Sequence, residues 1–371
     1  MNNKQKISQL AVQGVQELVP YTPGKPVDEL ERELGIRDIV KLASNENSLG
    51  PGPKVIEAIS QAVTEISRYP DGNGFALKAA LAKKLNVSMD QITLGNGSNE
   101  ILELLARTFL NPELEVVFSQ HAFAVYPLVT QAVGATAKIA AAINYGHDLD
   151  AMLALVNEKT RLVFIANPNN PTGTLLSAEA LKSFISALPE TSVCVLDEAY
   201  FEFVSAEKGC DSISWLAEFP NLVITRTFSK AYGLAGLRVG YSVSSSDIAD
   251  LLNRVRQPFN NNMLALAAAE AALNDQDYLA ETIAVNKNGM QQLTSAFTKL
   301  GLSWIPSFGN FVSVDLKQEG MPVYQALLKK GVIVRPVANY EMPTFLRISI
   351  GSEQENQFFI DALNAVLAET K

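Results

Sequence analysis

The chain has 371 residues, which is more than a single hydrophobic core usually serves, so we expect a large domain and a smaller one. A net charge of −9 argues against non-specific binding of nucleic acid. No apolar run reaches membrane-spanning length or has the form of a secretory signal, so we expect a cytoplasmic protein with no membrane partner.

The first part of the chain predicts an arm followed by two helices. Residues 4–19 have a weak helical period, and the prolines at 20, 23 and 26 indicate an extended segment after it. Apolar spacing predicts a helix from about residue 54 to 66. After a turn at 68–72, a second helix is expected to run to about residue 85.

From residue 92 onward, short apolar strands alternate with helical segments. Polar clusters follow most of these strands, which we place at 92–94, 116–118, 161–166, 193–196 and 221–227. This alternation is typical of an α/β fold with a mostly parallel sheet flanked by helices. Because ligands of such sheets bind beyond the carboxyl ends of the strands, the polar clusters indicate one shared site.

The pattern changes after about residue 262. A long helical stretch at 263–300 precedes short strands at 311–316, 332–335 and 345–350, and a closing helix at 358–367. We therefore expect a small α+β domain at 263–371 and a large ligand-binding domain at 51–262. Residues 1–50 would form the N-terminal arm and part of the small domain.

One stretch, residues 222–241, combines a buried strand with residues suited to chemistry. Lys230 follows the apolar strand, where the cost of desolvating its ammonium would lower its pKa and make it a nucleophile or base. Ser229 beside it and Arg238 downstream could face one phosphate, and the nearby glycines allow close backbone approach. The alternative is a surface lysine at a strand end.

This stretch resembles the Schiff-base segment of pyridoxal-phosphate aminotransferases of the aspartate aminotransferase fold, fold type I. The pattern Ser-Lys-Ala-aromatic-x-Leu-Ala-Gly-x-Arg-x-Gly is present in full at 229–240. Asn-Pro-x-Asn-Pro-Thr-Gly at 167–173 and Asp-Glu-Ala-Tyr at 197–200 also resemble motifs of that family. The resemblance covers nearly the whole chain and implies pyridoxal 5'-phosphate as the cofactor.

The resemblance implies a role for each cofactor-binding residue. Lys230 would be the catalytic lysine, assisted by Asp197 at the pyridine nitrogen and Tyr200 at the ring oxygen. The remaining cofactor-binding residues would contact the ring or the phosphate: Ser98, Asn99, Phe123, Asn170, Ser229, Arg238 and Tyr69. Tyr69 would reach the cofactor of a neighbouring subunit, which implies a homodimer with shared active sites.

Two of these residues also have a simpler structural interpretation. Ser98, in a glycine turn before a helix, could serve as an ordinary helix cap, and Phe123 could belong to the hydrophobic core. The chain has two histidines and two cysteines, none with metal-ligand spacing, so we expect no metal site. Scarce histidine agrees with lysine as the group that moves the proton.

The substrate is predicted from two arginines and an N-terminal motif. Arg347 resembles the carboxylate-binding arginine of the family, although a structural ion pair is the alternative, and Arg335 is a second cation. The N-terminal Pro-Tyr-x-Pro-Gly-Lys-Pro and Asn-Glu-Asn motifs most resemble the histidinol-phosphate aminotransferases. There, Tyr21, Asn47 and both arginines would bind histidinol phosphate and 2-oxoglutarate.

Three other functions remain open at this stage. An aromatic or other amino-acid aminotransferase of the same subgroup would keep the cofactor and change the donor. A pyridoxal-phosphate decarboxylase would use the same fold on a phosphorylated amino acid. A non-catalytic binding module on this fold would need a lost lysine or an added DNA-binding domain, and Lys230 is present.

Overall fold

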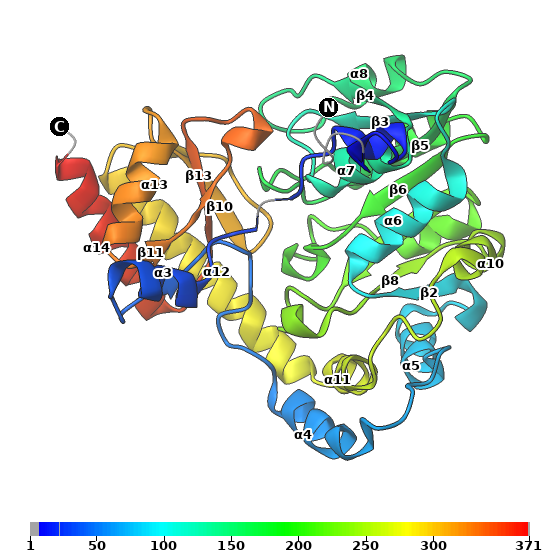
Figure 1. The fold of residues 1–371 in the computed structure, drawn as a ribbon, viewed down its shortest axis with the longest axis horizontal. Coiled ribbons are helices and arrows are strands. Elements are labelled where there is room, and N and C mark those ends of the chain that lie inside the picture. Colours follow the sequence, from blue (N-terminus) through cyan, green and yellow to red (C-terminus); the bar gives the residue numbers. More distant parts are fainter. Residues whose placement is uncertain (1–6, 22, 370–371) are drawn as a thin grey trace.

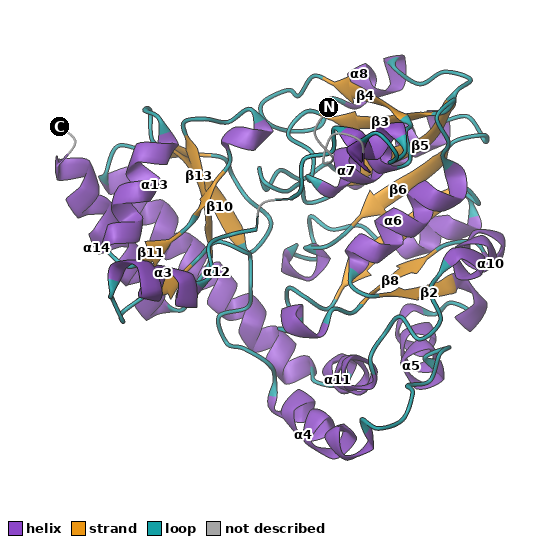
Figure 2. Ribbon diagram, viewed as in Figure 1, coloured by secondary structure: helices purple, strands orange, loops and turns teal. Residues whose placement is uncertain are grey.

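The computed structural model describes residues 7–21 and 23–369. Figure 1 shows a broad sheet with helices on both faces, and beside it a smaller group of strands and helices reached through one long helix. Figure 2 separates the same parts by secondary structure and shows that helices enclose both sets of strands. Within the described residues, no helix is long and apolar enough to cross a membrane.

The large sheet has seven strands in the order β2-β8-β7-β6-β5-β3-β4. Strand β8 runs antiparallel to both of its neighbours, and the other pairs are parallel, so the predicted mostly parallel α/β sheet is confirmed. The strands are β2 (Ile92–Gly95), β3 (Glu115–Ser119), β4 (Thr136–Ala140), β5 (Thr160–Ala166), β6 (Val193–Asp197), β7 (Leu222–Thr227) and β8 (Gly240–Val243).

Alternating side chains of the central strands build two cores, one on each face of this sheet. In β6, Cys194 and Leu196 belong to one hydrophobic cluster, whereas Val193 and Val195 belong to the other. The sheet is covered by α4 (Pro53–Ala62), α5 (Phe75–Leu85), α6 (Ser98–Phe109), α7 (Val125–Ala132), α8 (Leu149–Ala154), α9 (Ala178–Ala187), α10 (Ser246–Val255) and α11 (Met263–Leu273).

The smaller group contains a four-stranded sheet in the order β12-β13-β10-β9 and a third hydrophobic core. Its strands are β9 (Ser303–Trp304), β10 (Phe311–Asp315), β12 (Arg335–Pro336) and β13 (Phe345–Ser349). Its helices are α12 (Gln276–Lys299), α13 (Gly320–Lys329) and α14 (Glu353–Glu369). The strand predicted at 332–335 is divided, because its first half forms β11 (Val332–Ile333) in another sheet.

The N-terminal segment joins this smaller group. Strand β1 (Val40–Lys41) pairs in parallel with β11, and α3 (Val27–Leu34) precedes it. Figure 1 shows the blue α3 beside β11 and α14, which come from the end of the chain. Residues 4–6 of the helix expected at 4–19 lie outside the described residues. In the described part of this range, α2 (Gln13–Gln16) is a short helix.

The remaining short elements are 3-10 turns. The turns are η1 (Val63–Glu65), η2 (Met89–Gln91), η3 (Phe201–Phe203), η4 (Ser212–Ala217), η5 (Ala235–Leu237) and η6 (Ala338–Tyr340).

Helix α11 packs on α4, and its buried alanines belong to a core of the large sheet. The division of the chain at residue 262 stays a prediction.

Candidate active site

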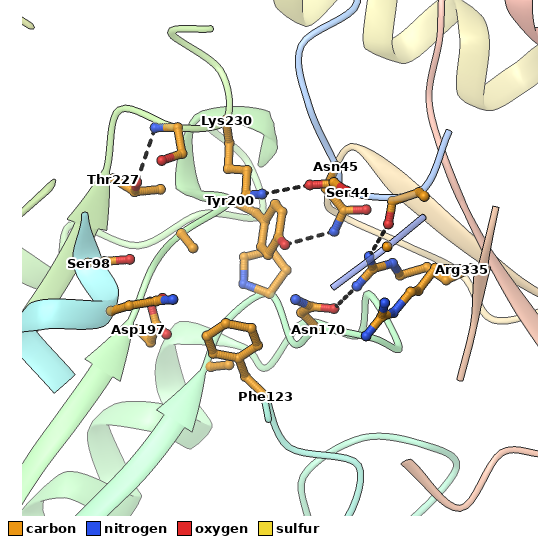
Figure 3. A pocket seen from close by; sticks show the side chains of 18 of the residues that line it. Ser44, Asn45, Ser98, Phe123, Asn170, Asp197, Tyr200, Thr227, Lys230 and Arg335 are labelled. Carbon is orange, nitrogen blue, oxygen red and sulfur yellow. Dashed lines mark hydrogen bonds between the residues drawn. The ribbon is translucent and has the colours of Figure 1, made fainter. Parts of the chain in front are cut away.

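A cavity of about 180 Å³ is lined on one side by residues at the carboxyl ends of the large sheet and on the other by residues of the smaller group. Figure 3 shows Lys230 and Tyr200 on one side of this space, with Asp197 and Phe123 facing them. Twelve residues predicted for the site line it: Tyr21, Ser98, Asn99, Phe123, Asn170, Asp197, Tyr200, Ser229, Lys230, Arg238, Arg335 and Arg347.

Lys230 lies three residues after the end of strand β7, at the start of a tight turn. The backbone N–H of Gly233, which has a φ of 70°, donates to the Lys230 carbonyl at 3.0 Å, and only glycine adopts this conformation readily. The Lys230 Nζ donates to the Ser44 carbonyl at 3.0 Å. Burial, together with the nearby charge of Arg347, lowers the pKa of Lys230 to about 7. A lysine with this pKa is present as a neutral amine in a substantial fraction of molecules near neutral pH.

Asp197 ends strand β6 and is buried, with 4% of its surface exposed. Its two carboxylate oxygens accept hydrogen bonds from the Tyr126 hydroxyl at 2.9 Å and the Thr225 hydroxyl at 3.0 Å. Burial raises the pKa of Asp197 to about 6, and these two donors oppose that rise. A cationic partner in the cavity would stabilise this carboxylate further.

The residues around the start of α6 form a donor-rich recess, which we call the phosphate cup: Gly97, Ser98, Ser229 and Arg238. The Arg238 guanidinium donates to the Ser229 hydroxyl at 3.2 Å. Gly97 has a φ of 77°, and a Cβ there would collide with the Arg238 guanidinium, so the close approach requires glycine. Two hydroxyls, a guanidinium and a helix N-terminus together suit a phosphate group.

The middle of the cavity is bounded by an aromatic ring and two hydrogen-bonding side chains. Tyr200, 3% exposed, accepts a hydrogen bond at its hydroxyl from the Asn45 amide at 2.9 Å. Burial raises the pKa of Tyr200 to about 12, so its hydroxyl stays protonated at neutral pH. The side-chain oxygen of Asn170 accepts a hydrogen bond from the Arg347 guanidinium at 2.5 Å. Phe123 contributes an apolar wall.

Two arginines from neighbouring strands occupy the side of the cavity nearest the smaller group. Arg335 and Arg347 are directly paired in the register of β12 and β13. Arg347 is 6% exposed and donates to the Ala43 carbonyl at 2.7 Å, whereas its Nε has no hydrogen-bond partner among the described residues. The Arg335 guanidinium lies 5.4 Å from the centre of the Tyr21 ring. A buried donor without a partner beside a second cation suits an anionic ligand.

Two predicted site residues do not line this cavity. The Asn47 amide donates to the Ala231 carbonyl at 3.0 Å and to the hydroxyls of Tyr278 and Thr282 at 3.1 Å. Tyr69 is 82% exposed and stacks on Phe259, with ring centres 4.9 Å apart. Their roles toward substrate and toward a partner's cofactor remain predictions.

Among the further residues that line the cavity, four have polar side chains that the sequence analysis did not select: Ser44, Asn45, Thr227 and Tyr340. Asn45 lies two positions before Asn47 in the same motif, and its proximity to a site tyrosine is set by long-range packing. The Thr227 hydroxyl accepts from the Ser229 backbone N–H at 3.1 Å, a local turn contact that the Thr-x-Ser spacing could have indicated. Tyr340 carries no comparable signal.

Comparison with known proteins identifies the family. The model of the aminotransferase class I and II family matches residues 37–363. The chain belongs to this family. A histidinol-phosphate aminotransferase of Pseudomonas fluorescens is 61% identical over 97% of this chain and 98% of its own length. A histidinol-phosphate aminotransferase of Pseudomonas aeruginosa has the same identity and coverage. The predicted aminotransferase family is therefore confirmed.

Solved structures agree with the assignment of the chain to the aminotransferase family. The histidinol-phosphate aminotransferase of Sinorhizobium meliloti, determined in complex with pyridoxal-5'-phosphate, superposes with a TM-score of 0.89. It is 31% identical, and the alignment covers 98% of both chains. An aspartate aminotransferase of Thermus thermophilus superposes with a TM-score of 0.82 at 20% identity, covering 95% of this chain and 98% of its own, and so supports the fold alone. The fold is that of the fold type I aminotransferases, as expected from the sequence.

Proposed function

We propose that this aminotransferase transfers the amino group of L-histidinol phosphate to 2-oxoglutarate, giving imidazole acetol phosphate and L-glutamate in histidine biosynthesis. The observation that carries the proposal is the 61% identity, over nearly full length, to histidinol-phosphate aminotransferases. The cavity agrees with it, because a lysine with a lowered pKa faces a pair of arginines at the substrate side. Such a site suits a donor that carries both an amine and a phosphate.

The cofactor is pyridoxal 5'-phosphate, and the donor groups of the cavity fit it. The phosphate cup would hold the phosphate, and Asp197 would face the ring nitrogen. Asn170 and Tyr200 would bind the ring oxygen, and Phe123 would cover one face of the ring. When bound, the cofactor supplies an electron sink for the carbon that loses its proton.

The residues of the chain would divide the remaining work among them. Lys230, with a pKa near neutral, would take the proton from the carbon that bears the donor's amino group and would deliver it to the aldehyde carbon of the cofactor. Tyr200 keeps its hydroxyl protonated and so acts as a hydrogen-bond donor. Arg347 and Arg335 orient the anionic groups of the two substrates, and burial of Arg347 strengthens its pull on a carboxylate.

The proposal also includes a cytoplasmic location and a homodimer in which the two subunits share their active sites. Several large apolar side chains on and near α4 and α5 are exposed in one chain and would be covered by a second: Ile56, Ile66, Tyr69 and Phe75. Exposed clusters of this kind are typical of interfaces. Sedimentation equilibrium checks the assembly. A species of one chain's mass at micromolar concentration would contradict the dimer.

The donor assay tests the function directly. Purified protein with pyridoxal 5'-phosphate and 2-oxoglutarate is given histidinol phosphate, phenylalanine, tyrosine or aspartate, and the glutamate formed is measured. We expect histidinol phosphate to give the highest kcat/KM. If an aromatic amino acid is preferred, the donor is wrong and the chemistry stands. If carbon dioxide is released instead of glutamate, the chemistry itself is wrong.

A further inference from the structure

Three consecutive asparagines, Asn260–Asn262, connect α10 to α11. None of the three lines the cavity. Each of their side-chain amides nevertheless donates a hydrogen bond to a backbone carbonyl of a segment that leads into the phosphate cup. We call these residues the asparagine run.

The first two members hold the segment that leads to Ser98. The Asn260 amide donates to the Leu94 carbonyl at 3.1 Å, and the Asn261 amide donates to the Gly95 carbonyl at 2.8 Å. Both carbonyls lie at the end of β2, just before the glycine turn. Asn261 is 4% exposed, so no water replaces its hydrogen bond easily. The asparagine run therefore fixes the direction in which the backbone enters α6.

The carboxylate of Glu100 extends this contact into the turn itself. One of its oxygens accepts from the Asn260 amide and from the Asn96 backbone N–H, both at 2.5 Å. Glu100 lies in the first turn of α6, where a negative charge is favourable. Asn260 thus contacts the end of β2 directly, at Leu94, and contacts the glycine turn through this carboxylate.

The third member holds the opposite side of the cup. The Asn262 amide donates to the Leu237 carbonyl at 3.2 Å, and Leu237 immediately precedes Arg238. Arg238 has a φ of 56°, a left-handed conformation that its surroundings must stabilise. The side-chain oxygen of Asn262 also caps α11 by accepting from the Ala265 N–H at 2.8 Å. One end of α11 is thereby tied to the segment that aims the guanidinium.

The asparagine run is itself anchored. The Arg256 guanidinium donates to the Asn260 side-chain oxygen at 2.6 Å and to the Gly72 carbonyl at 3.1 Å. Phe259, in a left-handed conformation with a φ of 57°, stacks on Tyr69. The asparagine run is therefore fixed by residues other than those of the phosphate cup, namely Arg256 and the stacked pair of Phe259 and Tyr69.

We propose that the asparagine run is a positioning element that aligns the Ser98 and Arg238 sides of the phosphate cup, and so gives the enzyme its affinity for the phosphate of its cofactor. This inference rests on the proposed function, since it assumes that the cup receives the phosphate of pyridoxal 5'-phosphate. Its members act through backbone carbonyls and the Glu100 carboxylate, and they do not line the cavity that would hold the cofactor. A misaligned cup loses contacts to the phosphate and leaves contacts to the pyridine ring in place.

The test compares two aldehydes that differ by the phosphate alone. Cofactor-free wild type, Asn261→Ala and Asn260→Ala are titrated with pyridoxal 5'-phosphate and with pyridoxal, and binding is followed by absorbance. The matched control is Asn221→Ala, because the Asn221 amide also donates to a carbonyl, that of Ser192 at 2.7 Å, but at the amino ends of β6 and β7, away from the cavity. Thermal midpoints of the cofactor-free proteins show whether each variant folds.

We expect each run variant to bind pyridoxal 5'-phosphate about tenfold more weakly than wild type, and to bind pyridoxal unchanged. The control should bind both like wild type. Equal weakening for the two aldehydes, or no weakening in either run variant, would overturn the inference. Asn260→Ala, at a less buried position, decides the matter if Asn261→Ala does not fold. A wild type that does not prefer the phosphorylated aldehyde would instead count against the proposed use of the cup.

Discussion

The cavity has two halves that are built in different ways. Its cofactor half consists of side chains at the carboxyl ends of strands of one sheet, with Asp197 at the end of β6, Lys230 after β7 and Ser98 after β2. Its substrate half comes from separate parts of the chain, namely Tyr21, Ser44 and the arginine pair of β12 and β13. The first half is fixed by a sheet packed on both faces, and the second by contacts between distant segments.

Hydrogen bonds between cavity-lining residues join the two halves. Among the described residues they include Lys230 with the Ser44 carbonyl, Tyr200 with Asn45, and Asn170 with Arg347. Each contact pairs a residue of the large-sheet side with one from the N-terminal segment or β13. The comparison teaches that changes in the first half should affect the chemical step, and changes in the second half should affect which substrate binds.

The largest effect is expected at the centre of the cofactor half. Lys230→Ala removes the amine that moves the proton, so turnover should be abolished, along with the absorbance that arises when wild type binds the cofactor covalently. Steady-state assays and spectra of purified protein check both. Transamination that survives in this variant would defeat the assignment of Lys230.

A smaller and more selective effect is expected in the substrate half. Arg335→Gln removes one charge next to Tyr21, so the KM for histidinol phosphate should rise about 10–100-fold. The absorbance of the bound cofactor should not change, because Arg335 lies away from the phosphate cup. Kinetics with histidinol phosphate and with phenylalanine measure the selectivity. An equal loss with both donors would break the proposed division of the cavity.

Loss of the hydrogen bond between Asn45 and Tyr200, which joins the two halves, should lower kcat/KM by a modest factor. Asn45→Ala removes the hydrogen bond to the Tyr200 hydroxyl, and one such bond contributes about 1 kcal/mol, or roughly five- to tenfold in kcat/KM. Both kcat and KM should change, because Asn45 touches both halves. The same assays detect this. A change confined to KM would place Asn45 in the substrate half alone.

The pH dependence of stability gives the smallest effect and involves the cofactor-free protein. Lys230 loses its proton near pH 7 in the fold but near 10.5 in the unfolded chain. Between these values the unfolded chain binds more protons, so this group makes the free energy of unfolding rise with pH. Lys230→Met should therefore exceed wild type in stability most at about pH 7 and progressively less toward about pH 9.5. Urea unfolding at several pH values measures this; parallel curves would contradict the lowered pKa.

The cofactor half could be predicted well from the sequence for a physical reason. Its residues follow apolar strands of a parallel sheet, and the carboxyl ends of such strands meet at one edge, so short motifs around Asp197, Asn170 and Lys230 indicate a common site. The fold class followed from the same alternation. Strand β8 completes the sheet in the antiparallel direction, which its short apolar run did not indicate.

The substrate half was harder to predict because it depends on long-range packing. Asn45 and Ser44 reach the cavity since β1 pairs with β11, far along the chain, and no local pattern encodes that pairing. The division of residues 332–335 between two sheets has the same origin. The role of the asparagine run has no local sequence signal, because its amides bind carbonyls that are distant in sequence.

The pairing of β1 with β11 has a consequence for how the enzyme is made. On the ribosome, the strands and the lysine of the large sheet emerge well before residues 332–333, so that sheet can form early. Residues 40–47 must wait, without their partner strand, until residues 332–333 have been synthesised. The pairing that brings the substrate half together can therefore form only after the strands of the cofactor half have left the ribosome.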